Sequence, residues 1–136
     1  MSEKLKTDTK NIPLWIDLGS WRKAIEDYEG AIEAWEYVTA IAPQNSIVLN
    51  NLGDLYAYYL KDISKAEEYF LRAINNEPSN IYFYFKIVEF YRETAKDPVK
   101  ARALLEKGIV ANPATSSDLK NLLKSLLQNF QPAPSD

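Results

Sequence analysis

The sequence contains no cysteine and no histidine, and each absence removes a class of chemistry. Without cysteine the chain forms no disulfide, offers no thiolate to a metal ion and has no thiol nucleophile. Without histidine it lacks a common zinc ligand, the most frequent general base and the central member of a Ser-His-Asp triad. We therefore predict no metal site, no cofactor and no catalytic residue, so the chain is not expected to be an enzyme.

Glycine is also scarce. The four glycines, at positions 19, 30, 53 and 108, are isolated from one another, which excludes a glycine-rich phosphate loop. Acidic residues are more frequent, and Asp54 and Glu89 fall at the same place in successive parts of the chain. We interpret them as charges that face solvent or a ligand rather than as a catalytic carboxylate pair.

Long apolar runs are absent as well. No stretch approaches the roughly 18 apolar residues of a membrane span, and residues 1–11 contain no apolar core of a signal peptide. We expect no membrane segment and, by default, a cytoplasmic protein. The net charge of -3 and the isoelectric point of about 5.1 argue against a nucleic-acid binder that depends on positive charge.

The composition is that of a globular protein. Of the 136 residues, 46% are hydrophobic and 26% are charged, and this length suits a single domain. Five positions recur three times at a spacing of 35 residues. The series are Asp27, Asp62 and Asp97; Ala31, Ala66 and Ala101; Trp35, Phe70 and Leu105; Val38, Ala73 and Gly108; Pro43, Pro78 and Pro113. Such a register indicates an array of similar units.

Each unit is predicted to contain two helices. Asp27, Asp62 and Asp97 are placed as N-caps of the second helices, where a carboxylate accepts hydrogen bonds from free N–H groups. Pro98 follows at the first helical position, which tolerates proline. The recurring prolines end each second helix, because a residue before proline avoids the helical region.

The first helices lie upstream, in residues 14–21, 48–56 and 82–91. Gly19 and Gly53 are 34 residues apart, so one residue is inserted between Tyr56 and Asp62. The third copy has Val88 in place of glycine. A glycine inside a helix costs up to about 1 kcal/mol relative to alanine, so its presence in two copies indicates a close approach by a neighbouring helix.

These features resemble the tetratricopeptide repeat, a helix–turn–helix unit of 34 residues. The matching residues are Trp15, Leu18, Gly19, Ala31, Trp35 and Pro43; Leu49, Leu52, Gly53, Tyr56, Ala66, Phe70, Ala73 and Pro78; Tyr84, Ile87, Tyr91, Ala101, Leu105 and Pro113. The resemblance implies an all-α fold of about seven helices, in which antiparallel helix pairs stack in a right-handed superhelix. Repeats then span residues 12–45, 46–80 and 81–115. Arg22 departs from the family pattern, which has an aromatic residue there.

A further helix is predicted at 116–130, with Ser116 or Ser117 as its cap. Its apolar positions are spaced to lie on one face: Leu119, Leu122, Leu123, Leu126, Leu127 and Phe130. It resembles the extra helix that covers the last repeat of such arrays. The domain therefore spans 12–130, between disordered segments at 1–11 and 131–136.

The resemblance also implies that the first helices line a concave groove. The predicted partner-binding residues are Asp17, Ser20, Asn50, Asn51, Asp54, Tyr58, Tyr82, Phe85, Lys86, Glu89 and Arg92. Among them, the two asparagines are suited to hold a peptide backbone, and the three aromatic residues supply apolar contact. The acidic members favour a partner segment with lysine or arginine.

One sub-family is not supported. Its members clamp a chaperone's terminal carboxylate with residues that correspond here to Ile16, Ser20, Asn51, Tyr82 and Lys86. Only Asn51 matches, while Lys86 keeps the charge, so we do not predict chaperone-tail binding.

The sequence therefore predicts a non-catalytic module that binds a protein or peptide ligand. The alternatives are self-association, in which the apolar surface of a terminal helix packs on a second copy, and an RNA-associated helical-repeat protein, which the acidic isoelectric point disfavours. We expect a monomer or a weak homodimer.

Overall fold

The structure, a computed structural model, describes residues 11–129. This part of the chain is all-α and contains no strand. Its elements are α2 (Ile12–Ala24), α3 (Tyr28–Ile41), α4 (Ser46–Asp54), the π-helical turn η2 (Leu55–Tyr59), α5 (Ile63–Asn76), α6 (Ile81–Glu93), α7 (Pro98–Ala111), the 3₁₀ turn η3 (Pro113–Thr115) and α8 (Ser116–Asn129). The prediction of an all-α chain with about seven helices is confirmed for the described residues. The predicted disordered segments lie outside them, except for Asn11, which precedes α2.

The predicted starts and ends of the three second helices are confirmed. Asp27, Asp62 and Asp97 each accept a hydrogen bond from the backbone N–H three residues later, at 2.9 to 3.1 Å. Pro98 occupies the first position of α7. Each second helix ends two residues before its proline, since α3, α5 and α7 stop at Ile41, Asn76 and Ala111. Local chemistry in the sequence therefore determines where these helices begin and end.

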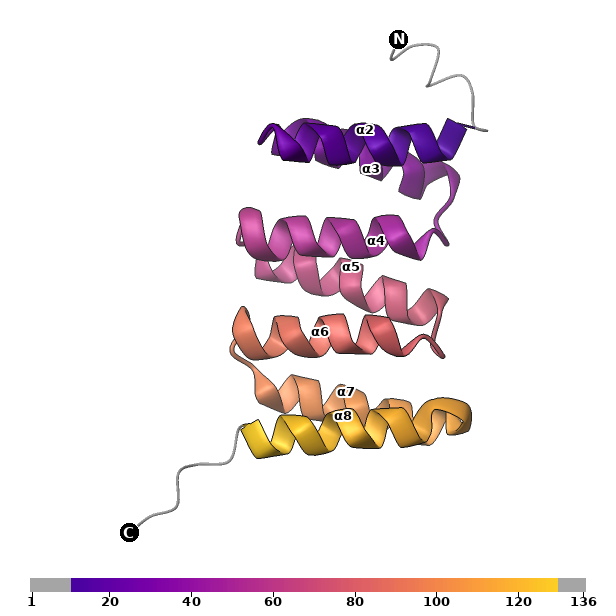
Figure 1. The fold of residues 1–136 in the computed structure, drawn as a ribbon, viewed down its shortest axis with the longest axis vertical. Helices are drawn as coiled ribbons and strands as arrows, with labels where there is room; N and C mark the ends of the chain where they lie inside the picture. Colours follow the sequence, from indigo (N-terminus) through magenta and orange to yellow (C-terminus); the bar gives the residue numbers. More distant parts are fainter. Residues whose placement is uncertain (1–10, 130–136) are drawn as a thin grey trace.

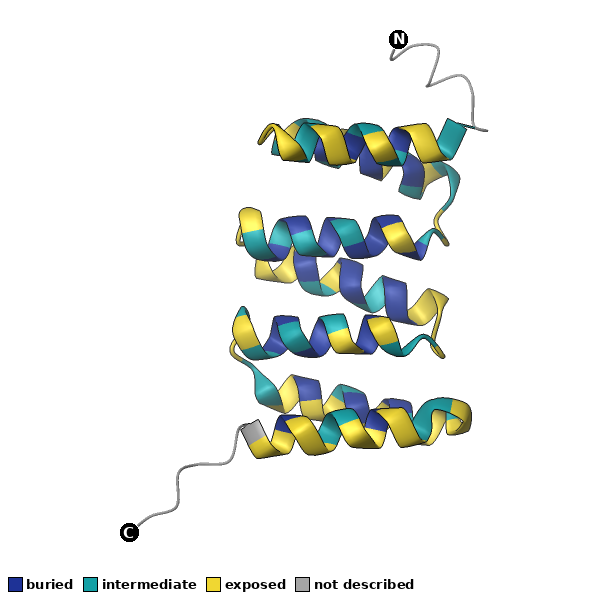
Figure 2. Ribbon diagram, viewed as in Figure 1, coloured by how far each residue is buried: buried dark blue, intermediate teal, exposed yellow. Residues whose placement is uncertain are grey.

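The helices pack as three consecutive antiparallel pairs, α2 with α3, α4 with α5 and α6 with α7. Figure 1 shows the pairs stacked in chain order, with α2, α4 and α6 in the layer nearest the viewer and their partners behind. Buried residues line the contacts between helices (Figure 2). They form one continuous core that runs from Trp15 to Leu126.

Close packing between two helices explains why glycine occurs at positions 19 and 53. Gly53 faces the Phe70 ring, and a Cβ on Gly53 would lie 2.7 Å from Phe70 Cδ1, too close for non-bonded carbon atoms. Gly19 faces Trp35 in the same way. In the third pair, Val88 stands in place of the glycine and Leu105 in place of the aromatic residue. Both are buried. The predicted close approach is therefore confirmed, between the two helices of one pair.

The inserted residue widens the turn at the end of the first helix. In the first pair, the Asp27 N–H donates to the carbonyl of Arg22, five residues back, at 2.7 Å. In the second pair the Asp62 N–H reaches the carbonyl of Tyr56, six residues back, at 2.9 Å. The turn η2 carries this extra residue, since a π-helical turn holds one residue more than an α-helical turn.

The last helix, α8, packs on α6 and α7. Leu119 and Leu126 are buried in this contact, whereas Leu127 is exposed and Phe130 lies outside the described residues. The predicted cap is wrong, because Ser116 has helical dihedral angles and Ser117 lies inside the helix. The chain enters α8 directly from the turn η3, which ends at Thr115.

Candidate ligand-binding face and pocket

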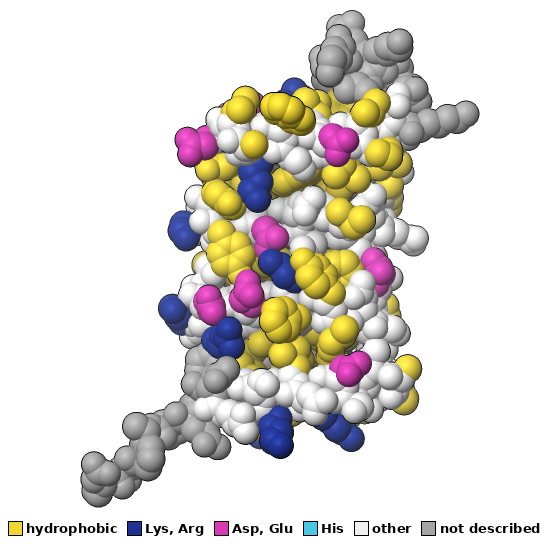
Figure 3. Space-filling view, viewed as in Figure 1, with side chains coloured by type: hydrophobic (Ala, Val, Ile, Leu, Met, Phe, Trp, Pro, Cys, Tyr) yellow, Lys and Arg dark blue, Asp and Glu magenta, His cyan; other side chains and the backbone are white. Residues whose placement is uncertain are grey.

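The first helices α2, α4 and α6 form the surface that Figure 3 presents, which we call the front face. The predicted binding residues all lie on these helices or on η2. The exposed ones are Asp17, Ser20, Tyr82 and Phe85; the half-buried ones are Asn51, Asp54, Tyr58, Lys86, Glu89 and Arg92. Figure 3 shows charged and apolar side chains close together over α4 and α6.

Asn50 differs from the prediction, because it is buried and is not accessible on the front face. Its side chain is only 5% exposed, and its Oδ1 has no hydrogen-bond partner among the described residues. Ser46, one helical turn earlier, is buried in the same way. Both residues face neighbouring helices rather than solvent. A ligand lying on the surface therefore meets Asn51 but not Asn50.

The gap between α4 and α6 is filled by side chains that bind one another. Lys86 Nζ lies 2.9 Å from Asp54 Oδ1, and the Tyr58 hydroxyl donates to Glu89 Oε1 at 3.2 Å. Burial alone would lower the pKa of Lys86, but the hydrogen bond and charge of Asp54 raise it above the usual value. Burial, together with Glu89, raises the pKa of Tyr58 well above 10. These four predicted binding residues therefore join the second helix pair to the third.

This pairing changes the predicted charge preference for a ligand. Asp54 is neutralised by Lys86, and Glu89 keeps its charge but already accepts a hydrogen bond from the Tyr58 hydroxyl. Arg92 lies 3.0 Å from Glu93 and so contributes little net positive charge. Asp17 remains as the exposed acidic residue of α2. The front face is therefore more neutral than the sequence suggests.

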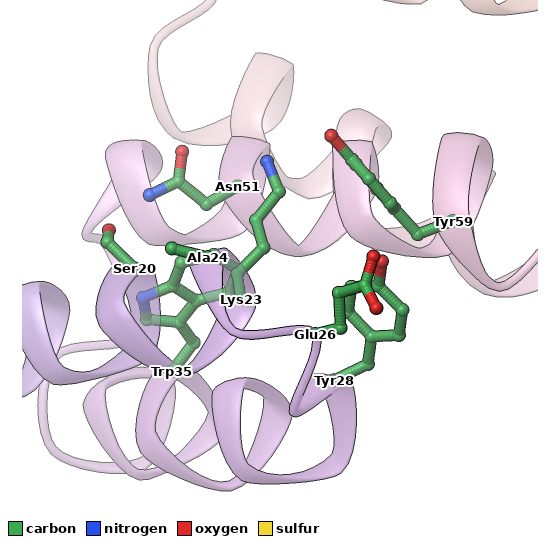
Figure 4. Close-up of a pocket in the computed structure, with 8 residues that line it drawn as sticks. All are labelled: Ser20, Lys23, Ala24, Glu26, Tyr28, Trp35, Asn51 and Tyr59. Atoms are coloured by element: carbon green, nitrogen blue, oxygen red, sulfur yellow. The ribbon is translucent and has the colours of Figure 1, made fainter.

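The corresponding gap between α2 and α4 is open. It contains a pocket of about 430 Å³, lined by Ser20, Lys23, Ala24, Glu26, Tyr28, Trp35, Asn51 and Tyr59. Figure 4 shows Ser20, Ala24, Trp35 and Asn51 toward one end of the pocket, and Glu26, Tyr28 and Tyr59 toward the other. Two of the predicted residues, Ser20 and Asn51, meet here.

Small side chains on α2 explain why this gap is open. Ser20 and Ala24 in the first unit correspond to Asp54 and Tyr58 in the second unit, 34 residues later. In the second gap the longer side chains reach α6 and fill the space. In the first gap, Ser20 and Ala24 are too short to reach α4. The same backbone arrangement therefore produces one filled gap and one pocket.

Some polar groups that line the pocket already form hydrogen bonds within the protein, and others are available to bind a ligand. The Trp35 indole Nε1 and the Ser20 hydroxyl both donate to the carbonyl of Ile16, at 3.0 and 3.2 Å. Lys23 Nζ lies 4.7 Å from the centre of the Tyr59 ring and has no carboxylate partner in the described part of the chain. The Asn51 amide makes no hydrogen bond there either. Lys23 and Asn51 thus supply unused hydrogen-bond donors beside aromatic surface.

Burial and the nearby Glu26 carboxylate raise the pKa of Tyr28, whose ring lies 5.3 Å from that of Tyr59. Tyr28 therefore keeps its proton at neutral pH and offers a neutral hydroxyl to the pocket. Such a set of groups suits reversible binding of a polar chain with an apolar side group.

Three exposed apolar residues extend the front face beyond the pocket. Ile47 lies on α4, one turn before Asn51, and Tyr82 and Phe85 lie on α6. Each of the three side chains is more than half exposed. Tyr82 and Phe85 are therefore accessible from solvent, and their role as apolar contacts stays a prediction.

Sequence reasoning did not identify Glu26, Tyr28, Trp35 or Tyr59 as pocket residues. Trp35, one of the residues that match the repeat, is buried, but one edge of its ring reaches the pocket. Tyr59 is turned toward α3 by the π-helical turn, which no sequence periodicity marks. The only available signal was the pair of short residues, Ser20 and Ala24.

Within residues 11–129, no group of three or more acidic residues is arranged to hold a metal ion. Among the helices described, none is both long and apolar enough to cross a membrane. No protein-family model matches the chain, and no curated protein matches it.

Proposed function

We propose that this chain is a non-catalytic binding module of the tetratricopeptide-repeat type, which binds a peptide segment of a partner protein on its front face. The family assignment is supported by the three helix pairs, the recurring Asp caps and the glycine–aromatic contacts. In this proposal the pairs continue the right-handed superhelix implied by the resemblance.

The observation that carries the proposal is the open pocket between α2 and α4. It combines unused donors on Lys23 and Asn51 with the aromatic surface of Tyr59. Asparagine amides hold peptide backbones because each offers donors and an acceptor at once. An extended segment would be held at Asn51 and would insert one side chain into the pocket.

The rest of the segment would run toward α6, over Ile47, Tyr82 and Phe85. Aromatic side chains bind apolar groups with little loss of conformational entropy. Because Asp54 and Glu89 are already engaged, basic residues in the segment would depend mainly on Asp17 and Glu26. We therefore expect apolar contacts to contribute more to affinity than charge.

A peptide library displayed on phage tests this proposal. Peptides are selected on the wild-type chain and then measured on the variant Ala24→Tyr, which fills the pocket with the side chain found at the equivalent Tyr58. A second variant, Asn51→Ala/Tyr82→Ala/Phe85→Ala, removes the contacts on α4 and α6. Both change residues that are at least partly exposed, so the fold should persist. Circular dichroism checks the helical content.

We expect both variants to weaken the selected peptides by about tenfold or more, as for central interface contacts. The control Val99→Ala/Val110→Ala changes two exposed apolar residues of α7 and should bind as the wild type does. Equal binding by all four proteins would reject the front face as the site. Salt-sensitive binding of single-stranded RNA in place of peptides would favour the RNA alternative.

A further inference from the structure

A row of apolar side chains lies exposed on α2, separate from the pocket. We call it the outer stripe, and it consists of Leu14, Leu18, Trp21 and Ile25. Leu18 is half-buried, whereas Leu14, Trp21 and Ile25 are 50%, 72% and 69% exposed. Spacings of four, three and four residues place them on one side of the helix. A tryptophan so exposed is unusual for a surface that contacts only water.

The same positions in the other first helices are buried. Leu14, Leu18 and Trp21 correspond to Val48, Leu52 and Leu55 in the second unit and to Phe83, Ile87 and Phe90 in the third. All six of these equivalents are at most 5% exposed. The positions are therefore apolar in every unit and protected from water in two of the three.

The contacts of the equivalents show what protects them. The Phe90 ring lies 5.3 Å from Phe70 on α5, the second helix of the preceding pair. Tyr59, which corresponds to Ile25, lies 5.3 Å from Tyr28 on α3. The outer stripe is thus the surface by which a unit packs on the second helix before it. In the described chain, α2 has no such helix before it.

The outer stripe could be covered by a second copy in two ways. A head-to-tail contact needs a free second-helix surface, but α3 and α5 are covered by the next pair, and α8 packs on α7. Leu119 of α8 is fully buried in this contact. What remains is contact of the stripe with the same stripe of another copy, which closes as a two-fold dimer instead of growing into a filament.

The segment before α2 has little to offer as a cover. Residues 1–10 contain only two apolar side chains, Met1 and Leu5, among charged and polar ones. Two such side chains cannot match an apolar stripe four residues long. A second copy, in contrast, provides an identical apolar stripe.

We propose that two copies of this chain associate through the outer stripe, with α2 of one packed on α2 of the other. The exposed parts of the stripe offer on the order of 400 Å² per copy, so the interface falls at the low end of specific interfaces. The dimer is accordingly weak and reversible. Trp21 at its centre is the anchor, because buried tryptophans dominate interface energies. This surface is distinct from the pocket, so the front face of each copy keeps its ligand.

Sedimentation velocity at chain concentrations from roughly 1 μM to 1 mM tests the proposal. The wild-type mass should rise from 15.6 kDa to twice that value and then remain constant. Trp21→Glu should weaken the dimer about thirtyfold or more. The matched control Val110→Glu makes the same kind of change at another exposed apolar residue and should dimerise as the wild type does.

A second measurement identifies the surface. Dilution of the wild type should shift the amide NMR signals of α2 and leave those of α6 unchanged. The front-face variant Tyr82→Ala/Phe85→Ala should still dimerise. The proposal is overturned if the wild type stays monomeric throughout, if Trp21→Glu dimerises equally well, or if the mass keeps growing beyond the dimer.

Discussion

At the scale of single residues, two positions in each helix pair share one limited volume. The first pair combines Gly19 with Trp35, and the second combines Gly53 with Phe70. The third combines Val88 with Leu105, where both side chains are of middle size. The larger residue is on the second helix wherever the first helix has glycine. Packing density in a core is nearly constant, so a gain at one position requires a loss at the other.

This shared volume predicts how the substitution Gly53→Val changes stability. The added side chain would overlap the Phe70 ring, so we expect a loss of about 2–3 kcal/mol in the free energy of unfolding. Adding Phe70→Leu reproduces the pair found in the third unit and should recover a substantial part of that loss. Urea denaturation of the two single variants and the double variant measures the coupling between the sites.

Phe70→Leu alone serves as the control, and it should cost roughly 1 kcal/mol because it leaves unfilled volume. If the double variant loses as much as the two single variants together, the positions do not share volume and the explanation fails.

At the scale of elements, each first helix is followed, two or three residues after its end, by a residue in the left-handed region. Glu26, Lys61 and Lys96 have φ angles of 65°, 57° and 56°, and each directly precedes an Asp cap. Left-handed backbone is unfavourable for residues with a Cβ, and glycine is usual at this place after a helix. These turns therefore contain a small, removable strain.

We expect Lys61→Gly to raise the free energy of unfolding by about 0.5–1 kcal/mol, since glycine adopts this φ without strain. Lys124→Gly, inside α8, removes the same charge from an ordinary helical position and should lower stability by up to about 1 kcal/mol. Thermal unfolding followed by circular dichroism compares the two. Destabilisation by both variants to the same degree would contradict the prediction.

The π-helical turn η2 is the element that connects the fold to the candidate site. It holds Tyr58 and Tyr59, which are adjacent in sequence but contact different helix pairs. Tyr58 reaches Glu89 in the filled gap, and Tyr59 lies near Tyr28 and Lys23 at the pocket. The π-helical turn, which carries the inserted residue, thereby places one tyrosine in the gap between α4 and α6 and the next tyrosine at the pocket between α2 and α4.

At the scale of the whole molecule, three tyrosine–glutamate hydrogen bonds join neighbouring pairs. Tyr58 donates to Glu89, Tyr69 to Glu36 and Tyr91 to Glu67, at 2.7 to 3.2 Å. Burial, followed by the adjacent carboxylate, raises the pKa of each tyrosine well above 10. These bonds require the protonated phenol, so they depend on pH.

Stability should therefore fall in alkaline solution. The unfolded tyrosines lose their protons near pH 10, while the folded ones hold theirs to higher pH, so stability is fully present below pH 10 and is lost as the pH rises above it. Urea midpoints at pH 8, 10 and 11 measure the loss. A Tyr69→Phe/Tyr91→Phe variant should be less stable at pH 8 but should decline less with pH.

Lysine side chains also lose protons in this range, so the comparison between the wild type and the phenylalanine variant is what isolates the tyrosines. An equal decline in both proteins would assign the alkaline loss to other groups. Absorbance at 295 nm, which detects tyrosinate, gives an independent reading of how many tyrosines resist ionisation in the folded state.

The two proposed surfaces also belong to the whole molecule. The pocket and Tyr82 lie on the front face, while Trp21 lies on the outer side of α2, so the chain could hold a peptide and a second copy together. Two linked copies would then present two pockets, and a partner with two binding segments would be held more tightly than by either pocket alone.

Much of the fold could be predicted from the sequence because its signals are local or repeated. The caps at Asp27, Asp62 and Asp97, the proline stops and the insertion before Asp62 all follow from chemistry within a few residues. The candidate site was predictable only in part. Ser20, Asn51, Tyr82 and Phe85 follow from helical position, but Asn50 shares the same kind of position and is buried.

The sequence alone determined that this chain forms capped helix pairs of similar length, since capping and proline effects act within one helical turn. Only the tertiary structure decided which gap between pairs is filled and which is open, because that depends on whether Asp54 and Tyr58 reach α6 while Ser20 and Ala24 stop short of α4. It also decided that Trp21 is exposed while the equivalent Leu55 is fully buried. These outcomes depend on residues that are distant in sequence and meet only once the helices have packed.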